Sequence, residues 1–159
     1  MKNRKLITTM MALAFSICLL NGVSSIQAQP THRRCKAVRG NLGVVFSPGA
    51  ANGSITNGGF LNGSVAQAFN PGSVVPTADP TSITFTGDST ITTIHGTLVT
   101  RDVYLFDFVR LLGPAMFRVD PVASTGIFAG AEGVIYLNPV SAATDTGQAE
   151  LGGRICYPE

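Results

Sequence analysis

Residues 103–109 read Val-Tyr-Leu-Phe-Asp-Phe-Val, and this stretch decides the fold class. Successive side chains of an extended strand point to opposite faces of a sheet. One face therefore carries Val103, Leu105, Asp107 and Val109. The other face carries Tyr104, Phe106 and Phe108. A sheet with one face in water alternates apolar with polar residues. Apolar residues on both faces instead predict a closed sheet, packed inside and covered outside by another layer or subunit.

The rest of the chain after residue 28 also indicates strands rather than helices. Short apolar stretches alternate with Gly, Pro, Asn and Asp, and no window carries a sustained helical apolar stripe. Eight strands are expected, at Ala37–Phe46, Gly59–Phe69, Ser82–Thr86, Thr90–Thr100, Val103–Val109, Ala115–Asp120, Gly126–Leu137 and Gln148–Tyr157. Eight short runs at this spacing, with glycines inside them where a sheet bends, predict an all-β, closed eight-stranded antiparallel β-barrel.

The segments between these strands carry turn residues. Ser47–Gly58 and Asn70–Pro80 are the two longest and are expected to be loops. Asn52-Gly53 is interpreted as a turn because both residues accept positive φ. The prolines are expected between strands, where a missing backbone donor is tolerated. Asn52 and Asn62 also begin glycosylation sequons, whose use depends on the host.

The first 28 residues have the pattern of a secretory signal peptide. Lys2, Arg4 and Lys5 precede the largely apolar stretch Leu6–Leu20, and a small-residue segment ends at Ala28. Polar residues interrupt the apolar stretch, which makes a membrane anchor the less favoured alternative. We therefore expect residues 1–28 to be removed and 29–159 to form a single domain that is secreted or periplasmic, with no stable membrane span.

The charge of the expected mature chain is close to neutral. Without the leader's three basic residues, eight basic side chains face nine acidic ones. The absence of a basic run argues against nucleic acid as a partner. No phosphate-binding loop or dinucleotide fingerprint is present, so no cofactor is expected.

Two cysteines remain after loss of the leader, Cys35 and Cys156. In an exported chain such a pair is expected to form a disulfide. Closing a loop of about 120 residues would stabilise the fold by roughly 4–5 kcal/mol in the chain-entropy model. The alternatives are two free thiols or a metal-ligand pair. A metal site is disfavoured because no Cys-x-x-Cys spacing is present and the only histidines are His32 and His95.

The segment Ser124-Thr-Gly-Ile-Phe-Ala-Gly-Ala-Glu-Gly133, with Ser89–Leu98 before it and Gly152-Gly-Arg-Ile-Cys156 after it, carries a family resemblance. It resembles the Gly-Thr-Gly-Arg-Phe-Ala-Gly-Ala-Thr-Gly segment of the allene oxide cyclase and dirigent barrel superfamily, with Ser124 and Ile127 as departures. The resemblance covers residues 82–157 and implies an eight-stranded barrel with a central cavity. The family's activities are cyclisation of an unstable lipid epoxide and stereochemical guidance of phenoxy-radical coupling. No family pocket residue matches a motif here, so the catalytic residues, if any, are unknown.

The same segment has a packing logic of its own. Phe128 is the one large side chain among small ones and is expected to be buried in the core. Gly126, Gly130 and Gly133 would permit close backbone packing around it. A phosphate-binding loop is disfavoured because strand-like residues follow Gly133.

Few residues in the barrel suggest chemistry. His95 is expected on a strand, where it could be an acid–base group or an ordinary wall residue. Asp107 and Glu132 lie within apolar strands, and ion pairing with Arg110, Arg118 or Arg154 is the simplest interpretation. No serine hydrolase motif is present.

Two hypotheses remain. The favoured one is an exported, non-catalytic barrel that binds a small apolar ligand or a partner protein. The alternative is a cofactor-free isomerase or cyclase, or a stereochemical guide, whose cavity folds a reactive molecule. Two-sided apolar strands would also leave apolar surface exposed on a lone barrel, which predicts a homo-oligomer, either dimer or trimer.

Overall fold

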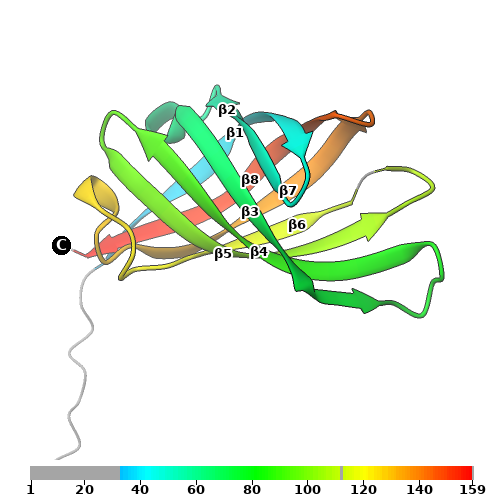
Figure 1. Ribbon diagram of the computed structural model, residues 1–159. Coiled ribbons are helices and arrows are strands. Elements are labelled where there is room, and N and C mark those ends of the chain that lie inside the picture. The colour runs from blue at the N-terminus through cyan, green and yellow to red at the C-terminus, as the bar shows by residue number, and fades with distance from the viewer. Residues whose placement is uncertain (1–32, 112, 159) are drawn as a thin grey trace, which may run out of the picture. The chain divides into compact units, whose positions relative to one another are not determined.

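The protein is an eight-stranded antiparallel β-barrel in a computed structural model that describes residues 33–111 and 113–158 (Figure 1). The elements in chain order are β1 (Arg33–Ser47), β2 (Ala50–Thr56), η1 (Gly59–Leu61), β3 (Gly63–Pro76), β4 (Ser82–Thr93), β5 (Gly96–Asp107), β6 (Ala115–Val119), η2 (Gly126–Phe128), β7 (Glu132–Ala142) and β8 (Thr146–Pro158). Each strand pairs with the next, and β8 pairs with β1. The predicted fold class is confirmed. The predicted signal peptide at residues 1–28 lies outside the described residues. Within the described part of the chain, no helix has the length and apolar character to cross a membrane.

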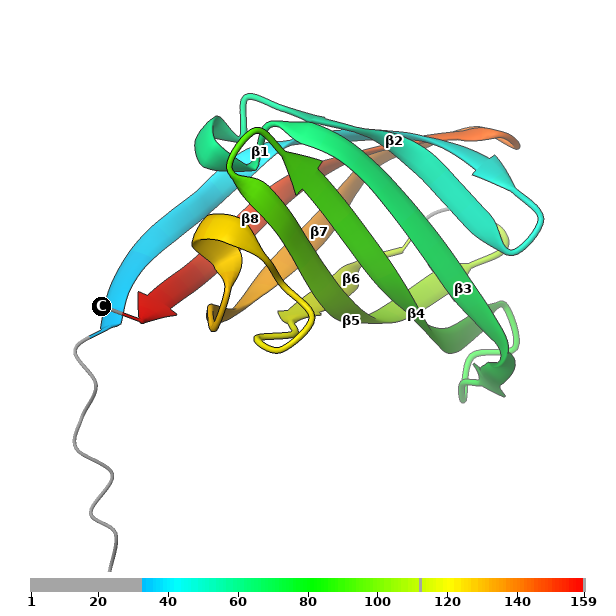
Figure 2. The same cartoon turned by 60° about the vertical axis from the view of Figure 1, so that its left-hand side comes forward.

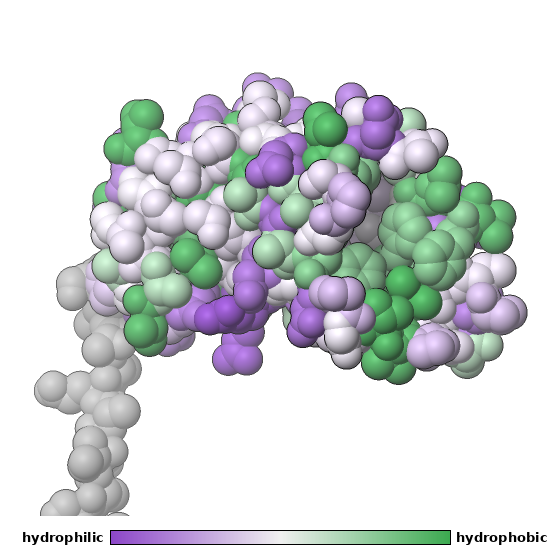
Figure 3. Space-filling model, viewed as in Figure 1, coloured by the Kyte–Doolittle hydropathy of each residue, from purple (hydrophilic) through white to green (hydrophobic). Residues whose placement is uncertain are grey.

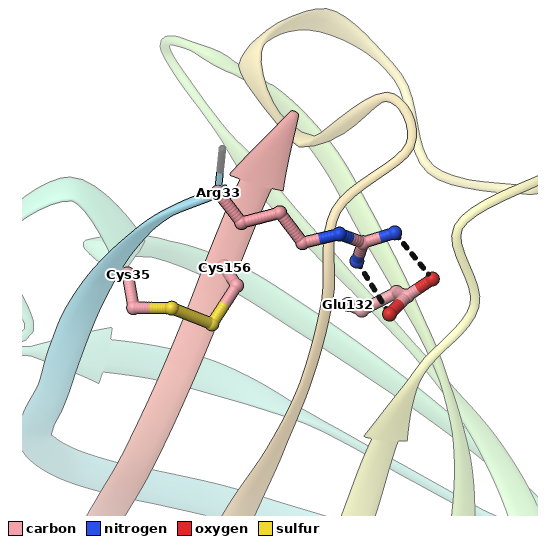
Figure 4. Close-up of a disulfide and its surroundings, with 4 residues drawn as sticks. All are labelled: Arg33, Cys35, Glu132 and Cys156. Atoms are coloured by element: carbon pink, nitrogen blue, oxygen red, sulfur yellow. Dashed lines mark hydrogen bonds and ion pairs between the residues drawn. A yellow bond between two sulfur atoms is a disulfide. The ribbon is translucent and has the colours of Figure 1, made fainter. Parts of the chain in front are cut away.

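The seam between β1 and β8 closes the barrel. Their antiparallel register runs from Arg33–Pro158 to Val45–Thr146. Cys35 and Cys156 lie directly opposite each other in this register, with their Cα atoms 3.9 Å apart, and form the predicted disulfide (Figure 4). Arg33 reaches from β1 across β8 to Glu132 on β7, where its Nη2 donates to Oε1 at 2.9 Å. One end of the seam therefore carries both a covalent and an ionic connection.

The predicted number of strands is right, although two errors in the segmentation offset each other. The expected loop Ser47–Gly58 contains β2, which was missed. The region from Ser82 to Val109 forms two long strands, β4 and β5, in place of the three short ones expected.

The missed strand β2 has a clear physical cause. Asn52-Gly53 lies inside β2, paired with Val44 and Val45 of β1, and does not form a turn. A Cβ at Gly53 would lie 1.9 Å from the carbonyl oxygen of Gly43 on β1. Glycine is therefore required here by a close approach between two strands.

The turn at His95 was also missed. The chain reverses at Ile94-His95, between β4 and β5, in the middle of the strand expected at Thr90–Thr100. Thr93 organises this turn, because its Oγ1 accepts from the His95 amide at 3.0 Å and donates to the Gly96 carbonyl at 3.0 Å. Apolar residues on both sides of the turn give it the composition of a continuous strand.

The prolines do not all lie between strands, as was expected. Pro71 and Pro76 lie within β3, and Pro139 lies within β7. The β3–β4 register shifts between Asn70 and Val75, and the β7–β8 register shifts at Pro139. These irregular pairings tolerate a residue that cannot donate a backbone hydrogen bond.

One end of the barrel is plugged. The turns η1 and η2 lie at this end together with the β4–β5 turn (Figures 1 and 2). Leu61 of η1 and Phe128 of η2 are completely buried, and the Phe60 and Phe128 rings lie 6.3 Å apart. The expected strand Gly126–Leu137 thus begins only at Glu132, because Gly126–Phe128 forms η2. The predicted burial of Phe128 is confirmed.

The glycines around Phe128 allow η2 to dock on the β4–β5 turn. Gly126 has φ of +63°, and a Cβ there would lie 2.3 Å from the His95 carbonyl oxygen. The amide of Ile127 donates to the same carbonyl at 3.1 Å. Backbone contact at this point holds Phe128 over the core.

We expect Phe128→Ala to lower the free energy of unfolding by about 3–5 kcal/mol, because it empties a fully buried aromatic site. Urea unfolding followed by circular dichroism measures the change. Ile127→Ala is the matched control, since Ile127 is its neighbour in η2 but is 45% exposed. Similar, small losses for the two variants would show that Phe128 does not support the plugged end.

Candidate ligand-binding cavity

The end of the barrel opposite the plug holds an open cavity of about 510 Å³. Its wall is built by inward-facing residues at alternate positions of the strands, as Leu42, Val44 and Phe46 of β1 show. Its lining reaches the end of β1 at Ser47 and the β5–β6 and β7–β8 connections, at Leu111, Gly113, Ala143 and Thr144. Apolar residues gather at this end of the molecule, on the right in Figure 3. The predicted central cavity is therefore present, but it occupies only the unplugged half of the barrel.

Aromatic side chains form a rigid part of the cavity wall. Phe85 of β4 and Tyr104 of β5 stack with ring centroids 4.8 Å apart and planes within 10°. Phe69 of β3 packs edge-on against both rings, at 5.5 Å and 5.3 Å. Phe117 of β6 packs against the far side of Tyr104 at 5.9 Å. These contacts fix the position of the Tyr104 hydroxyl.

A layer of polar side chains lies at the inner end of the cavity. Asp102 of β5 is 2% exposed, and its Oδ2 accepts hydrogen bonds from Ser89 and, at 3.0 Å, from Tyr104 Oη. Its Oδ1 accepts from Thr100 Oγ1 at 2.6 Å. Gln67 Nε2 donates to Tyr104 Oη at 3.2 Å and to Ser89 Oγ at 3.3 Å. Gln67 and Tyr104 line the cavity, whereas Asp102 lies behind them.

Asp102 is a buried carboxyl group with hydroxyl donors and no ionic partner. No lysine, arginine or histidine nitrogen of the described residues lies within 4.0 Å of it. Burial raises the pKa of Asp102 from 3.8 to about 6, although the hydrogen bonds from Ser89, Thr100 and Tyr104 oppose this shift. Burial, followed by the nearby charge of Asp102, raises the pKa of Tyr104. Asp102 can therefore keep its proton up to about pH 6, and Tyr104 stays protonated at neutral pH.

The residues singled out from the sequence lie elsewhere. His95 is exposed in the β4–β5 turn at the plugged end, not in the barrel wall. Asp107 Oδ1 accepts from the amides of Val109 and Arg110, and the Arg110 guanidinium lies 3.7 Å from its Oδ2. Glu132 pairs with Arg33 and not with Arg118 or Arg154. None of these residues lines the cavity.

Asp102 was missed because Arg101-Asp102 was taken as the break between two expected strands. A signal was nevertheless present. Thr100, Asp102 and Tyr104 alternate with the outward residues Arg101 and Val103 through one continuous strand. Period-two alternation across the supposed break would have placed the three polar groups on the inner face.

No family model matches the chain, and no curated protein matches it. Among solved structures, a pterocarpan synthase dirigent protein is similar, with 14% identity over 86% of this chain and 98% of that chain and a TM-score of 0.33. A TM-score of this size does not establish a shared fold. The barrel assignment therefore rests on the strand pairing, and membership of the allene oxide cyclase and dirigent superfamily stays a prediction.

We expect the contribution of Asp102 to the stability of the protein to fall as pH rises from about 4 to about 6 and then to level off. The lowered pKa values of Asp79 and Asp120, caused mainly by hydrogen bonds from backbone amides, act in the opposite direction at lower pH. The raised pKa means that the folded state binds the Asp102 proton more tightly than the unfolded chain does, so this contribution is lost as the carboxyl ionises. About two pKa units correspond to at most about 3 kcal/mol. Urea unfolding across this pH range measures the loss.

Asp102→Asn should abolish this pH dependence, because the amide keeps the shape of the side chain and does not titrate. Asp145→Asn is the control, since Asp145 is exposed in the β7–β8 turn and does not contact Asp102, so its loss should leave the slope intact. An unchanged slope in Asp102→Asn would assign the effect to another group.

Proposed function

We propose that this protein is an exported, non-catalytic barrel that binds one small apolar molecule in the cavity at its open end. The observation that carries this proposal is the cavity itself, whose volume of about 510 Å³ falls within the range of roughly 300–1,000 Å³ that is typical of small-molecule sites. Its wall is mostly apolar and its aromatic part is held rigid by ring contacts. Little ordering is then needed when a ligand enters.

The polar layer defines the kind of ligand that fits. Gln67 and Tyr104 offer one polar position at the inner end of a mostly apolar cavity. The other polar residues of the lining are Ser47, Ser141, Thr144 and Gln148, which lie toward the β1–β2 and β7–β8 connections. A ligand with an apolar body and one hydroxyl or carbonyl group at its inner end matches this arrangement. A carboxylate at that position is disfavoured, because Asp102 lies behind Tyr104 and no cationic side chain of the described residues is near enough to offset two negative charges.

Export is part of the proposal. Disulfides persist in oxidising compartments and are rare in the cytosol, so the Cys35–Cys156 bond fits a secreted or periplasmic protein. The leader pattern at residues 1–28 points in the same direction.

A cavity-filling substitution tests the binding function. The mature protein should bind the neutral dye Nile red with one molecule per barrel, measured by fluorescence titration. Ala149→Phe should weaken binding at least about ten-fold, because Ala149 lines the cavity and the larger ring occupies the space. Ala66→Phe, on the outer face of β3, is the matched control and should bind normally. Equal binding by the two variants at equal melting temperature would contradict a ligand site in this cavity.

A second function is favoured by one observation, the hydrogen bond from Tyr104 to Asp102 at the cavity floor. When Asp102 is protonated, this hydrogen bond would reverse, with Asp102 donating to Tyr104 Oη and Tyr104 donating to an oxygen of a bound molecule. Tyr104 would then pass its proton to that oxygen and take one from Asp102, and both protons would move back when the oxygen is released. Such a relay would support a cofactor-free isomerase or cyclase acting on an acid-labile apolar epoxide, or steering its ring closure.

Tyr104→Phe separates the two functions. The substitution keeps the ring contacts and removes the proton, so Nile red affinity should change by less than about three-fold. If the barrel is catalytic, epoxide conversion above the buffer rate should fall with rising pH near 6 and should disappear in Tyr104→Phe. Chiral chromatography of the products measures rate and selectivity. Wild-type conversion no faster than buffer would leave binding alone.

A further inference from the structure

Exposed apolar side chains gather at the open end of the barrel. The β5–β6 connection carries Phe108 and Val109, which are 52% and 74% exposed, and the end of β3 carries Val75, which is 56% exposed. The β3–β4 and β5–β6 connections extend beyond the barrel wall at this end (Figure 1, right), where green side chains gather in Figure 3. Large apolar side chains grouped on a surface mark a place that another molecule covers.

The two connections form one supported surface. The amide of Phe108 donates to the carbonyl oxygen of Thr81, in the β3–β4 connection, at 2.8 Å. Asp107 Oδ1 accepts from the amides of Val109 and Arg110 at 2.8 Å and 3.0 Å. These hydrogen bonds hold the backbone in place without using the apolar side chains, which stay available to contact another molecule.

The same apolar surface continues into the cavity. The Phe108 ring packs edge-on against Phe106 with ring centroids 5.5 Å apart, and Phe106 lines the cavity. Leu111 also lines the cavity and is still 43% exposed. Its φ of +55° is unfavourable for a leucine, so the fold holds this side chain at the mouth at a cost in backbone energy. The β5–β6 side is therefore the apolar side of the mouth.

The polarity of the cavity defines how an amphiphilic molecule enters it. Gln67 and Tyr104 lie at the inner end of the cavity, and the apolar side of the mouth lies at the other end. A ligand with one hydroxyl or carbonyl group therefore enters with that group first and leaves its apolar chain toward the mouth. An amphiphile in a bilayer is oriented in the same way, with its polar group at the membrane surface and its chain in the hydrocarbon. It can pass from one to the other without turning.

We propose that the open end of the barrel docks on an electrically neutral lipid bilayer, with Val75, Phe108 and Val109 in the membrane interface. The cavity then takes up a single-chain amphiphile from the bilayer, polar group first, and the chain of that molecule does not cross water. The docking surface stands on the exposed side chains alone, whereas the uptake route rests on the proposed ligand-binding function.

The charges at the open end specify a neutral bilayer. Among the described residues of the connections and strand ends there, Asp79, Asp107 and Asp145 supply three carboxylates, and Arg110 is the one cation. Hydrogen bonds from Thr81 hold the pKa of Asp79 below its usual value, so this carboxylate stays ionised at neutral pH. The net negative charge would repel anionic headgroups. A bilayer also fits better than a protein partner, because a protein that covered these side chains would close the mouth beside them.

Vesicle flotation tests the docking surface. The mature wild-type protein should float with phosphatidylcholine vesicles at low salt. Val109→Asp should weaken this binding at least about five-fold, because the new carboxylate resists entry into the membrane interface. Val122→Asp is the matched control and should bind normally. Val122 is 93% exposed in the β6–η2 connection at the plugged end, and its amide donates to Asp120 as the amide of Val109 donates to Asp107.

Other results of these measurements would overturn the proposal. A wild-type protein that does not float, or equal losses in Val109→Asp and Val122→Asp, would remove the open end as a docking surface. Tighter binding to phosphatidylglycerol than to phosphatidylcholine vesicles would contradict a neutral bilayer. A wild-type oligomer that sediments without lipid and dissociates in Val109→Asp would show that a second copy covers this end instead. Circular dichroism melting shows whether each variant is folded.

Transfer of Nile red tests the uptake route separately. The dye is loaded into phosphatidylcholine vesicles that contain a Cy5-labelled lipid, which quenches it until it moves to the barrel. Direct uptake predicts a transfer rate that rises in proportion to protein concentration, whereas transfer through water is limited by escape of the dye from the vesicle. Val109→Asp should slow transfer at least about five-fold and leave the affinity for Nile red in vesicle-free buffer within about two-fold, because Val109 does not line the cavity.

The two parts of the proposal fail in different ways. A transfer rate that does not depend on protein concentration would overturn uptake from the bilayer. A wild-type protein that binds no Nile red in vesicle-free buffer would overturn the ligand-binding function and the uptake route together. Flotation would still decide the docking surface in that case, since it does not require a ligand in the cavity.

Discussion

The pairing of β1 with β8 is the constraint on which the rest of the structure depends. Until these strands meet, the sheet has two edges and no enclosed interior. Once they meet, every strand has an inner and an outer face, and successive side chains point alternately into the barrel and out of it. The seam joins residues more than 100 positions apart along the chain, so its closure carries a large entropic cost. The disulfide and the Arg33–Glu132 ion pair both lie at one end of this seam.

Closure produces three layers inside the barrel. Phe128 and Leu61 fill the plugged end, Asp102 and its hydroxyl partners form the middle, and the open half is a cavity. The plugged end matters for the cavity, because water could reach the polar layer from both sides in a barrel that was open at both ends. Asp102 is buried without an ionic partner, which is tolerated because three hydroxyl groups donate to it and because it can keep its proton.

The sequence predicted what local patterns determine. The two-sided apolar stretch at residues 103–109 indicated closure, the isolated cysteine pair indicated the disulfide, and Phe128 among small residues indicated a buried site. Predictions from the sequence were wrong where a residue's position depends on strands that are distant along the chain. Asn52-Gly53 has the composition of a turn, but Gly53 is there because β1 passes too close for a Cβ. Asp102 follows an arginine in a polar pair, and only the barrel's interior determines that it is buried.

One strand, β5, contributes to the cavity and to the outer wall through its two faces. Asp102 and Tyr104 point inward to the cavity floor, while Val103 points outward and is 44% exposed. The two-sided apolar pattern therefore has two separate physical causes. The inward side chains pack as aromatic rings inside the barrel, and the outward side chains form an apolar surface on its outer wall. Because neighbouring residues on β5 belong to different faces, side-chain changes on one face leave the contacts of the other in place. A ligand in the cavity and a molecule on the outer wall would then be coupled only through the backbone of β5 and its neighbours. Such coupling would require the backbone to shift, and a barrel resists that shift because each of its strands is hydrogen-bonded on both sides. Ligand binding in the cavity and contacts on the outer wall should accordingly be nearly independent.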